Sequence, residues 1–309
     1  MNNQIHKEMV QEAVKPKFKG KKAIRCKTIP RYPDTAEREM KRAANAYIKI
    51  LNEELKKRLP SLIAAYKRER ASNARYDDLG DLERLVRRIF REVAEAVEQR
   101  FARLPLTNLF RGAAEMTRRN TLREWKRAVH ETLGIDLMSD YYDGSFYEEY
   151  IRKWVDENVL KIKSIPNQTL DKMQQTILDG FRNGRTIRDI QKDIQNEYNV
   201  TRDTARLIAG DQIATLNSQI TQAQQRDAGV TKYIWSTSHD SRVRECHAAL
   251  DGKIFSWDDP PAMWYNTKSK GTVYTGRRCN PGEDYACRCV ALPYFEFDKL
   301  DLPIAEGEK

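Results

Sequence analysis

The sequence lacks any run of about 18 consecutive apolar residues, the length that a membrane-spanning helix needs. Residues 1–27 carry basic side chains but no apolar segment of the kind that secretory signals contain, so we expect no such signal. We therefore expect a protein made in a reducing cytoplasm, with no membrane as a partner. In that compartment, grouped cysteines more often bind a metal or do chemistry than form disulfides.

The sequence also lacks the short motifs of several common enzyme classes. It contains no phosphate-binding Walker loop, no dinucleotide-binding glycine fingerprint, no HExxH zinc-protease motif and no GxSxG nucleophile motif. No period of about 20 to 50 residues repeats, which argues against a solenoid or a propeller. These absences weaken the enzyme hypotheses and favour a structural or binding protein that is not an enzyme.

Charge is abundant and unbalanced. Charged residues make up 32% of the chain, and the formal net charge is +10. This excess favours an acidic partner, for which DNA and an acidic protein surface are both candidates. The cationic runs lie mostly off the apolar stripes of the expected helices, and aromatic residues do not alternate with them as on a base-stacking surface. Charge alone therefore does not choose between the two partners.

Apolar residues recur at three-to-four spacing along most of the chain, which is the period of an amphipathic helix. We predict a mainly α fold, with helical N-terminal and central regions and a small α+β cysteine-containing C-terminal module. Pro60 and Pro166 are expected to separate helices. The predicted parts are a basic flexible arm at 1–33, a helical domain at 34–150, further helices at 151–230, a small α+β Cys/His module at 231–295 and a tail at 296–309.

The C-terminal module gathers most of the soft metal ligands. Four of the five cysteines and two of the four histidines fall within residues 235–293. A structural zinc site needs four thiolate or imidazole ligands, usually two from each of two chain segments. The sequence offers five candidates for these four places. The preferred set is Cys246, Cys279, Cys287 and Cys289, with His247 as an alternative ligand.

Two other interpretations of the module stay open. The spacing is not the CxxC…CxxC pattern, so Cys287 and Cys289 could be small packed side chains while His247 donates a buried hydrogen bond. A metal-dependent hydrolase or nuclease is the other alternative. Its candidate residues are His239, Asp240 and His247, with Glu283 or Asp284 as the base.

Local structure explains several polar residues of the module without chemistry. Asp240 can close an Asx turn after the strand expected at 233–235. Asp251 and Gly252 form a tight turn between a helix ending at Leu250 and the strand expected at 253–255. Trp235, Asp240, Arg242, Asp251 and Gly252 are therefore assigned structural roles.

The order of these elements resembles the phage Mu F-like minor head protein family of tailed bacteriophages, also called the phage head morphogenesis family. The resemblance covers about residues 155–293. The family pattern W-x-T-x-x-D-x-R-x-R-x-x-H-x-x-L-D-G falls on Trp235, Thr237, Asp240, Arg242, Arg244, His247, Leu250, Asp251 and Gly252. Its closing C-R-C falls on Cys287, Arg288 and Cys289. The family often has a histidine shortly before the C-R-C, and here Cys279 stands in its place.

The resemblance implies a minor capsid protein of the virion that takes part in head morphogenesis. It implies association with the phage portal protein or the major capsid protein, inside the head or near the portal, and a role close to packaged DNA. A structural Zn²⁺ is the expected cofactor, if any. The alternatives are a zinc-dependent nuclease or hydrolase and a simple DNA-binding module.

Overall fold

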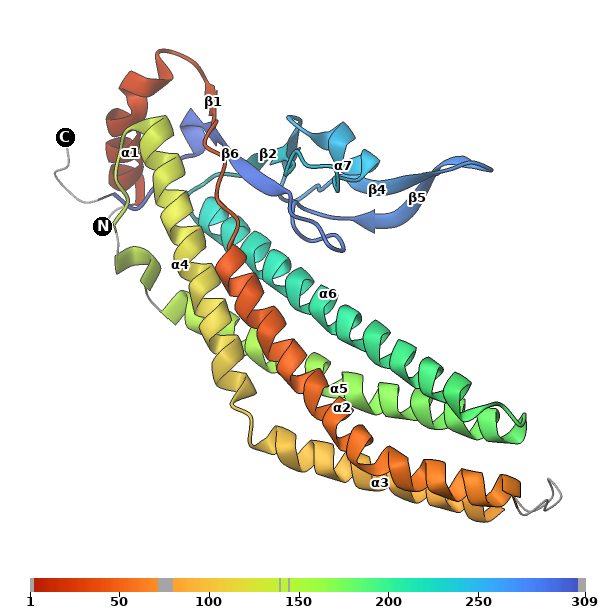
Figure 1. Cartoon of the computed structure of the whole chain (residues 1–309). Helices are drawn as coiled ribbons and strands as arrows, with labels where there is room; N and C mark the ends of the chain where they lie inside the picture. The colour runs from red at the N-terminus through yellow and green to blue at the C-terminus, as the bar shows by residue number, and fades with distance from the viewer. Residues whose placement is uncertain (1–2, 72–79, 139, 144, 305–309) are drawn as a thin grey trace. The chain divides into compact units, whose positions relative to one another are not determined.

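The computed structural model describes residues 3–71, 80–138, 140–143 and 145–304. The fold is mainly α with a small α+β C-terminal module, as predicted (Figure 1). None of its helices combines the length and the apolar character needed to cross a bilayer, among the residues described. The long helices are α1 (Asn3–Phe18), α2 (Asp34–Ala71), α3 (Gly80–Ala102), α4 (Leu106–Leu133), α5 (Ser145–Arg182) and α6 (Ile187–Asp227).

The C-terminal region contains one short helix and most of the strands. Its elements are β2 (Lys232–Ser236), α7 (Glu245–Leu250), β3 (Ile254–Ser256), β4 (Ala262–Thr267), β5 (Gly271–Arg278) and β6 (Val290–Glu296). One more strand, β1 (Ala23–Arg25), comes from the N-terminal region, and the short 3-10 helices are η2 (Asp140–Asp143) and η3 (Phe297–Lys299).

The chain divides into two compact units. The first comprises Met1–Glu37, Gly112–Trp154 and Gly210–Lys309, and the second comprises Arg38–Arg111 and Val155–Ala209. Four long helices, α2, α4, α5 and α6, therefore contribute residues to both units. This division differs from the sequential domains predicted from the sequence, because each unit is assembled from separate chain segments.

A four-stranded antiparallel sheet forms the centre of the first unit, in the order β1-β6-β2-β3. Figure 1 shows β6 between β1 and β2. Ile24 pairs with Phe295 on one side of β6, and Tyr233 pairs with Pro293 on the other. A separate two-stranded hairpin, β4–β5, follows β3. The fully buried Trp235 and Phe295 lie on the two central strands, so the sheet is a core element of this unit.

The structure corrects the predicted flexible arm at 1–33. Val10, Val14 and Phe18 are buried on one face of α1, and residues 23–25 add an edge strand to β6. The basic residues hide this apolar spacing of four in the sequence. The predicted tail also begins within the fold, because Leu300 and Leu302 are fully buried. Residues 305–309 lie outside the described part.

The two prolines do not end helices as predicted. Pro60 lies within α2 and Pro166 lies within α5. Each proline removes one backbone N–H donor, a cost that flanking packing must offset in a helix interior. In the second unit such packing is present: Tyr66, one and a half turns after Pro60, stacks on Phe181 with ring centroids 4.0 Å apart. Tertiary contacts therefore outweigh the local signal.

Helix α3 follows the sequence prediction closely. Its apolar residues recur every three or four positions, and all of that stripe is buried in the second unit: Leu82, Val86, Ile89, Phe90, Val93, Val97 and Phe101. Phe101 stacks on Tyr47 of α2 with the ring planes 16° apart. Periodicity and structure agree here because no proline or glycine interrupts the stripe.

Candidate metal centre

The site begins with a histidine held against the central sheet. Helix α7 carries His247, which is 2% exposed. Its ring packs edge-on against Trp235 of β2, with centroids 5.4 Å apart and planes 64° apart. Three cysteines lie in the same buried cluster: Cys279, Cys287 and Cys289. The packing fixes the imidazole where thiols from another chain segment can approach it.

The loop before β6 turns sharply and supplies those thiols. Ala286 has a φ of +48°, in the left-handed region that side chains other than glycine rarely adopt. Its N–H donates to the carboxylate of Asp211 on α6 at 2.5 Å, and the Cys287 N–H donates to the Asp284 carbonyl at 3.1 Å. This turn allows Cys287 and Cys289 to approach α7.

Three potential metal ligands converge as a result. His247 Nδ1 lies 3.6 Å from Cys287 Sγ and 3.5 Å from Cys289 Sγ. The three ligand atoms all lie within 4.8 Å of one another, and all three residues are buried. Within the described ranges, this is the only group of three or more His, Cys, Asp or Glu residues found with such spacing.

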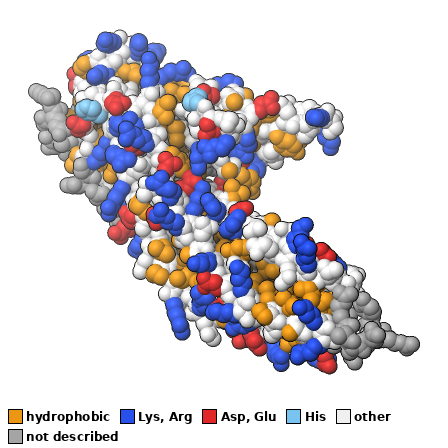
Figure 2. All heavy atoms as spheres, in the orientation of Figure 1, with side chains coloured by type: hydrophobic (Ala, Val, Ile, Leu, Met, Phe, Trp, Pro, Cys, Tyr) orange, Lys and Arg blue, Asp and Glu red, His pale blue; other side chains and the backbone are white. Residues whose placement is uncertain are grey.

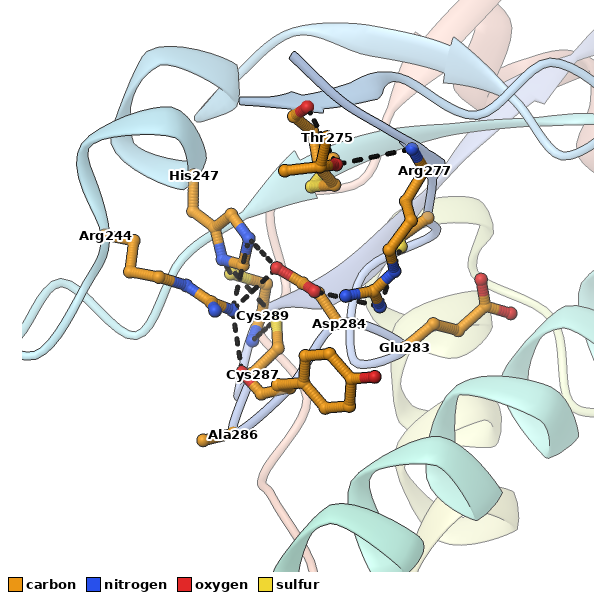
Figure 3. Close-up of polar contacts among 12 residues, drawn as sticks. Arg244, His247, Thr275, Arg277, Glu283, Asp284, Ala286, Cys287 and Cys289 are labelled. Atoms are coloured by element: carbon orange, nitrogen blue, oxygen red, sulfur yellow. Dashed lines mark hydrogen bonds and ion pairs between the residues drawn. The ribbon is translucent and has the colours of Figure 1, made fainter. Parts of the chain in front are cut away.

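Asp284 orients the histidine from its far side (Figure 3). Its Oδ2 lies 3.2 Å from His247 Nε2, and the Asp284 side chain is only 7% exposed. Arg244 and Arg277 hold the carboxylate through ion pairs of 2.8 Å and 3.0 Å. With Nε2 facing a carboxylate, the remaining nitrogen, Nδ1, faces the two sulfurs.

The pKa values reflect this concentration of polar groups. Burial alone would lower the pKa of His247, but hydrogen bonds with Asp284 and Cys287 outweigh it and raise that pKa. Burial would raise the pKa of Asp284, yet His247 and Arg244 hold it below its usual range. A hydrogen bond from Cys289, helped by His247, lowers the pKa of Cys287 against the effect of burial. The cluster therefore favours a carboxylate and a thiolate beside an imidazole.

Comparison with known proteins finds a family that is similar to the segment containing this site. Residues 171–292 match the family described as Phage Mu protein F like protein, and this range contains the whole cluster. Residues 171–292 are therefore similar to the Mu F-like family. The resemblance seen in the sequence is confirmed over that segment. No solved structure matches the chain.

One similar protein is known from Haemophilus influenzae (strain ATCC 51907 / DSM 11121 / KW20 / Rd). It is described as an uncharacterized protein and is 36% identical to this chain over 163 residues. The aligned stretch covers 53% of this chain and 33% of that protein, so the chain matches about a third of its relative's length. This relative is similar to the chain in sequence, and its description names no activity.

Within the Mu F-like segment, the predicted zinc ligands are not all in one place. Cys287 and Cys289 are together, and the alternative ligand His247 completes the group. Cys246 and Cys279 are also buried, but they do not belong to this group. Cys279 instead lies 3.6 Å from an Arg277 guanidinium nitrogen, and burial raises the pKa values of both thiols. The fifth cysteine, in the N-terminal region, is buried elsewhere in the first unit.

The residues of the hydrolase hypothesis are not gathered either. The His239 side chain is 57% exposed, and its Nδ1 lies 3.9 Å from the Asp251 carboxylate. Glu283 accepts a hydrogen bond from the Asn280 N–H at 2.8 Å, which closes a turn in the loop. Of the two proposed bases, only Asp284 contacts the buried histidine. These contacts stabilise the loop, and they do not bring the residues of the hydrolase hypothesis together.

Of the residues assigned structural roles, Trp235 lies in β2 and the others lie in or beside turns. Asp240 accepts a hydrogen bond from the Arg242 N–H at 2.9 Å, the contact of an Asx turn, and pairs with its guanidinium at 2.6 Å. Asp251 accepts from the N–H and the hydroxyl of Thr237. Gly252, with a φ of +72°, donates its N–H to the Trp235 carbonyl at 2.8 Å.

Sequence reasoning missed two arginine contacts around the cluster. Arg277, near the end of β5, pairs with Asp284 at 3.0 Å. Arg288, between the two cysteines, pairs with the buried Glu37 of α2 at 3.1 Å. The alternation of Arg288 with the two cysteines could have predicted this contact, because successive side chains of an extended segment point to opposite sides.

Proposed function

We propose that the protein is a minor head protein of a tailed bacteriophage that takes part in head morphogenesis and becomes part of the virion. The observation that carries this proposal is the Mu F-like match over residues 171–292. The proposed protein partner is the portal protein or the major capsid protein, and packaged DNA is a further proposed partner. The net charge of +10 is compatible with a position beside DNA.

The test is assembly with the portal protein encoded by the same phage genome. The two proteins are co-expressed and sedimented at a salt concentration that releases bound DNA. We expect this chain to sediment with the portal oligomers, and to be recovered in procapsids when the capsid proteins are also expressed. A chain that remains monomeric beside portal oligomers, and is absent from procapsids, would overturn the proposal.

The β4–β5 hairpin offers a surface for the DNA contact. Figure 1 shows it extending away from the four-stranded sheet. Tyr265 and Tyr274, one on each strand, are 52% and 67% exposed. A two-stranded ribbon fits the major groove of DNA, and exposed aromatic rings can stack on bases. A ribbon with both edges unpaired is only marginally stable alone, so a partner would stabilise it.

The charge of this hairpin is of one sign. From Ala262 to Arg278 the sequence has four cationic side chains and no carboxylate. Lys268 and Lys270 lie at the turn, are exposed, and take part in no ion pair found among the described residues. Basic side chains mark the outer end of the hairpin in Figure 2, whereas elsewhere on that face they are mixed with acidic ones. DNA therefore suits this surface better than a mixed-charge protein surface does.

Lysine-to-alanine changes test the hairpin. The double variant K268A/K270A should bind a short fluorescent DNA duplex more weakly, and the slope of log affinity against log salt should fall by about 2 because two phosphate contacts are lost. Fluorescence anisotropy over a salt series measures both quantities. The control is K172A/K192A, which removes two exposed lysines from α5 and α6. Equal effects of the two double variants would contradict a DNA contact at the hairpin.

A further inference from the structure

We propose that His247, Cys287 and Cys289 bind one zinc-class divalent cation, through Nδ1 and the two Sγ atoms. This ligand set differs from the four-cysteine set favoured by the sequence. It is independent of the head-assembly proposal, because it depends on the geometry of the cluster alone. Its role is structural: the ion would join α7 to the loop that leads into β6.

The spacing of the ligand atoms fits a tetrahedral ion. With Zn–S bonds of about 2.3 Å and Zn–N bonds of about 2.05 Å, a tetrahedral angle places nitrogen and sulfur about 3.6 Å apart. The observed distances from His247 Nδ1 are 3.6 Å to Cys287 Sγ and 3.5 Å to Cys289 Sγ. Both nitrogen–sulfur distances therefore match those around a tetrahedral ion, and the three atoms lie within 4.8 Å of one another.

Hydrogen bonding alone explains this arrangement less well. The neutral imidazole has one N–H and one acceptor nitrogen, and the Asp284 carboxylate takes the N–H at Nε2. Nδ1 then has a single lone pair, while two sulfurs lie at nearly equal distances from it. One lone pair accepts one hydrogen bond well. A cation at the centre satisfies Nδ1 and both sulfurs together.

The residues around the cluster resemble those that surround metal-bound histidine and cysteine in proteins. A metal-bound histidine usually donates its other N–H to a carboxylate or carbonyl, which fixes the ring and strengthens it as a ligand. Asp284 occupies that position, and Arg244 and Arg277 hold it there. The Cys289 backbone N–H also points to Cys287 Sγ, at 3.4 Å, and would stabilise a bound thiolate.

The donor set selects the metal class. Two thiolates and one imidazole suit zinc, whereas magnesium and calcium prefer oxygen ligands. Three protein ligands leave the fourth tetrahedral position to a water molecule. Because the three side chains come from two segments about 40 residues apart in the sequence, the ion would close a long loop of a small module.

Metal analysis of the purified full chain tests the proposal. We expect about one zinc per chain after dialysis, and a sulfur-to-cobalt charge-transfer band when cobalt replaces zinc. C287S, C289S and H247A should lose the zinc and weaken the band. The matched controls are C246S and C279S, which remove equally buried thiols outside the group and should keep both. Helical circular dichroism confirms that each variant is folded.

Asp284→Asn provides a variant that keeps all three ligands. It should weaken zinc binding by about 10- to 100-fold, because the amide orients the imidazole less well than the carboxylate does. A wild-type chain that neither contains nor takes up zinc or cobalt overturns the proposal. So does a metal that survives H247A but is lost in C246S or C279S, since a different ligand set would then hold it. Failure of portal binding would leave these measurements unaffected.

Discussion

Replacing Gly229 with alanine is expected to lower the free energy of unfolding by about 3 kcal/mol. Gly229 follows the last turn of α6 with a φ of +73°, and it ends the helix in a left-handed cap. A Cβ at this position would lie 1.9 Å from the backbone carbonyl oxygen of Lys299. That carbonyl belongs to a segment fixed by the Asp301 N–H, which donates to the Ala228 carbonyl at 3.0 Å. Backbone would have to move to relieve the clash.

The matched control separates strain from collision. Gly20 has a similar φ of +78°, but a Cβ there meets nothing within 4 Å. G20A should cost only about 1 kcal/mol, the cost of left-handed backbone for a residue with a side chain. Urea unfolding followed by circular dichroism measures both variants. Equal losses for G229A and G20A would show that the approach of the Lys299 carbonyl does not matter.

Glu54→Gln is the second large change, and we expect it to destabilise the second unit by about 3 kcal/mol at neutral pH. The Glu54 side chain is only 4% exposed and accepts hydrogen bonds from three cations. Lys57 and Arg58 approach at 2.7 Å, and Arg100 on α3 approaches at 2.8 Å. A neutral amide leaves these cations facing one another without the negative charge that holds them.

The effect should depend on pH in a definite direction. Hydrogen bonds from Lys57, Arg58 and Arg100 lower the pKa of Glu54 to about 2, below the value of about 4.3 for an unfolded chain. The stabilisation is therefore complete above about pH 4.3 and is lost as the pH falls towards 2. The difference in unfolding free energy between wild type and E54Q should shrink over that interval.

Urea titrations at several pH values measure this difference. Glu92 is a suitable control, because it is 51% exposed and its ion-pair distances are 3.9 Å and 4.0 Å. E92Q should change stability by less than about 1 kcal/mol at every pH. A wild-type advantage over E54Q that stays constant from pH 7 to low pH would contradict the role assigned to the carboxylate.

The sequence predicts those parts of the fold that local periodicity controls. The apolar stripe of α3 and the turn at Asp251 and Gly252 lie where the pattern indicates, because their determinants are a few residues apart. The continuous helices through Pro60 and Pro166 were not predicted, and near Pro60 the packing comes from a distant segment, where Tyr66 stacks on Phe181. Strand β1 was missed because three residues carry almost no periodic signal.

The sequence likewise predicts only part of the candidate site. The crowding of cysteine and histidine near the C-terminus indicated the region in which the cluster lies, but it did not show which of the five candidates lie together. The choice of His247 over Cys246 depends on which side of a short helix faces the loop, and adjacent residues on a helix point about 100° apart. The turn that positions the two thiols has a left-handed backbone at Ala286. The sequence does not indicate this turn, because the residue is not a glycine.

The position of β6 in the sheet determines when the sheet can form as the chain is synthesised. This strand lies between β1 and β2, yet the ribosome makes it more than 260 residues after β1. An incomplete chain that stops before residue 290 has no partner for β1 and none for the edge of β2 that β6 occupies. A truncated product would therefore leave β1 and one edge of β2 unpaired, and the four-stranded sheet forms only once the last residues of β6 have been made.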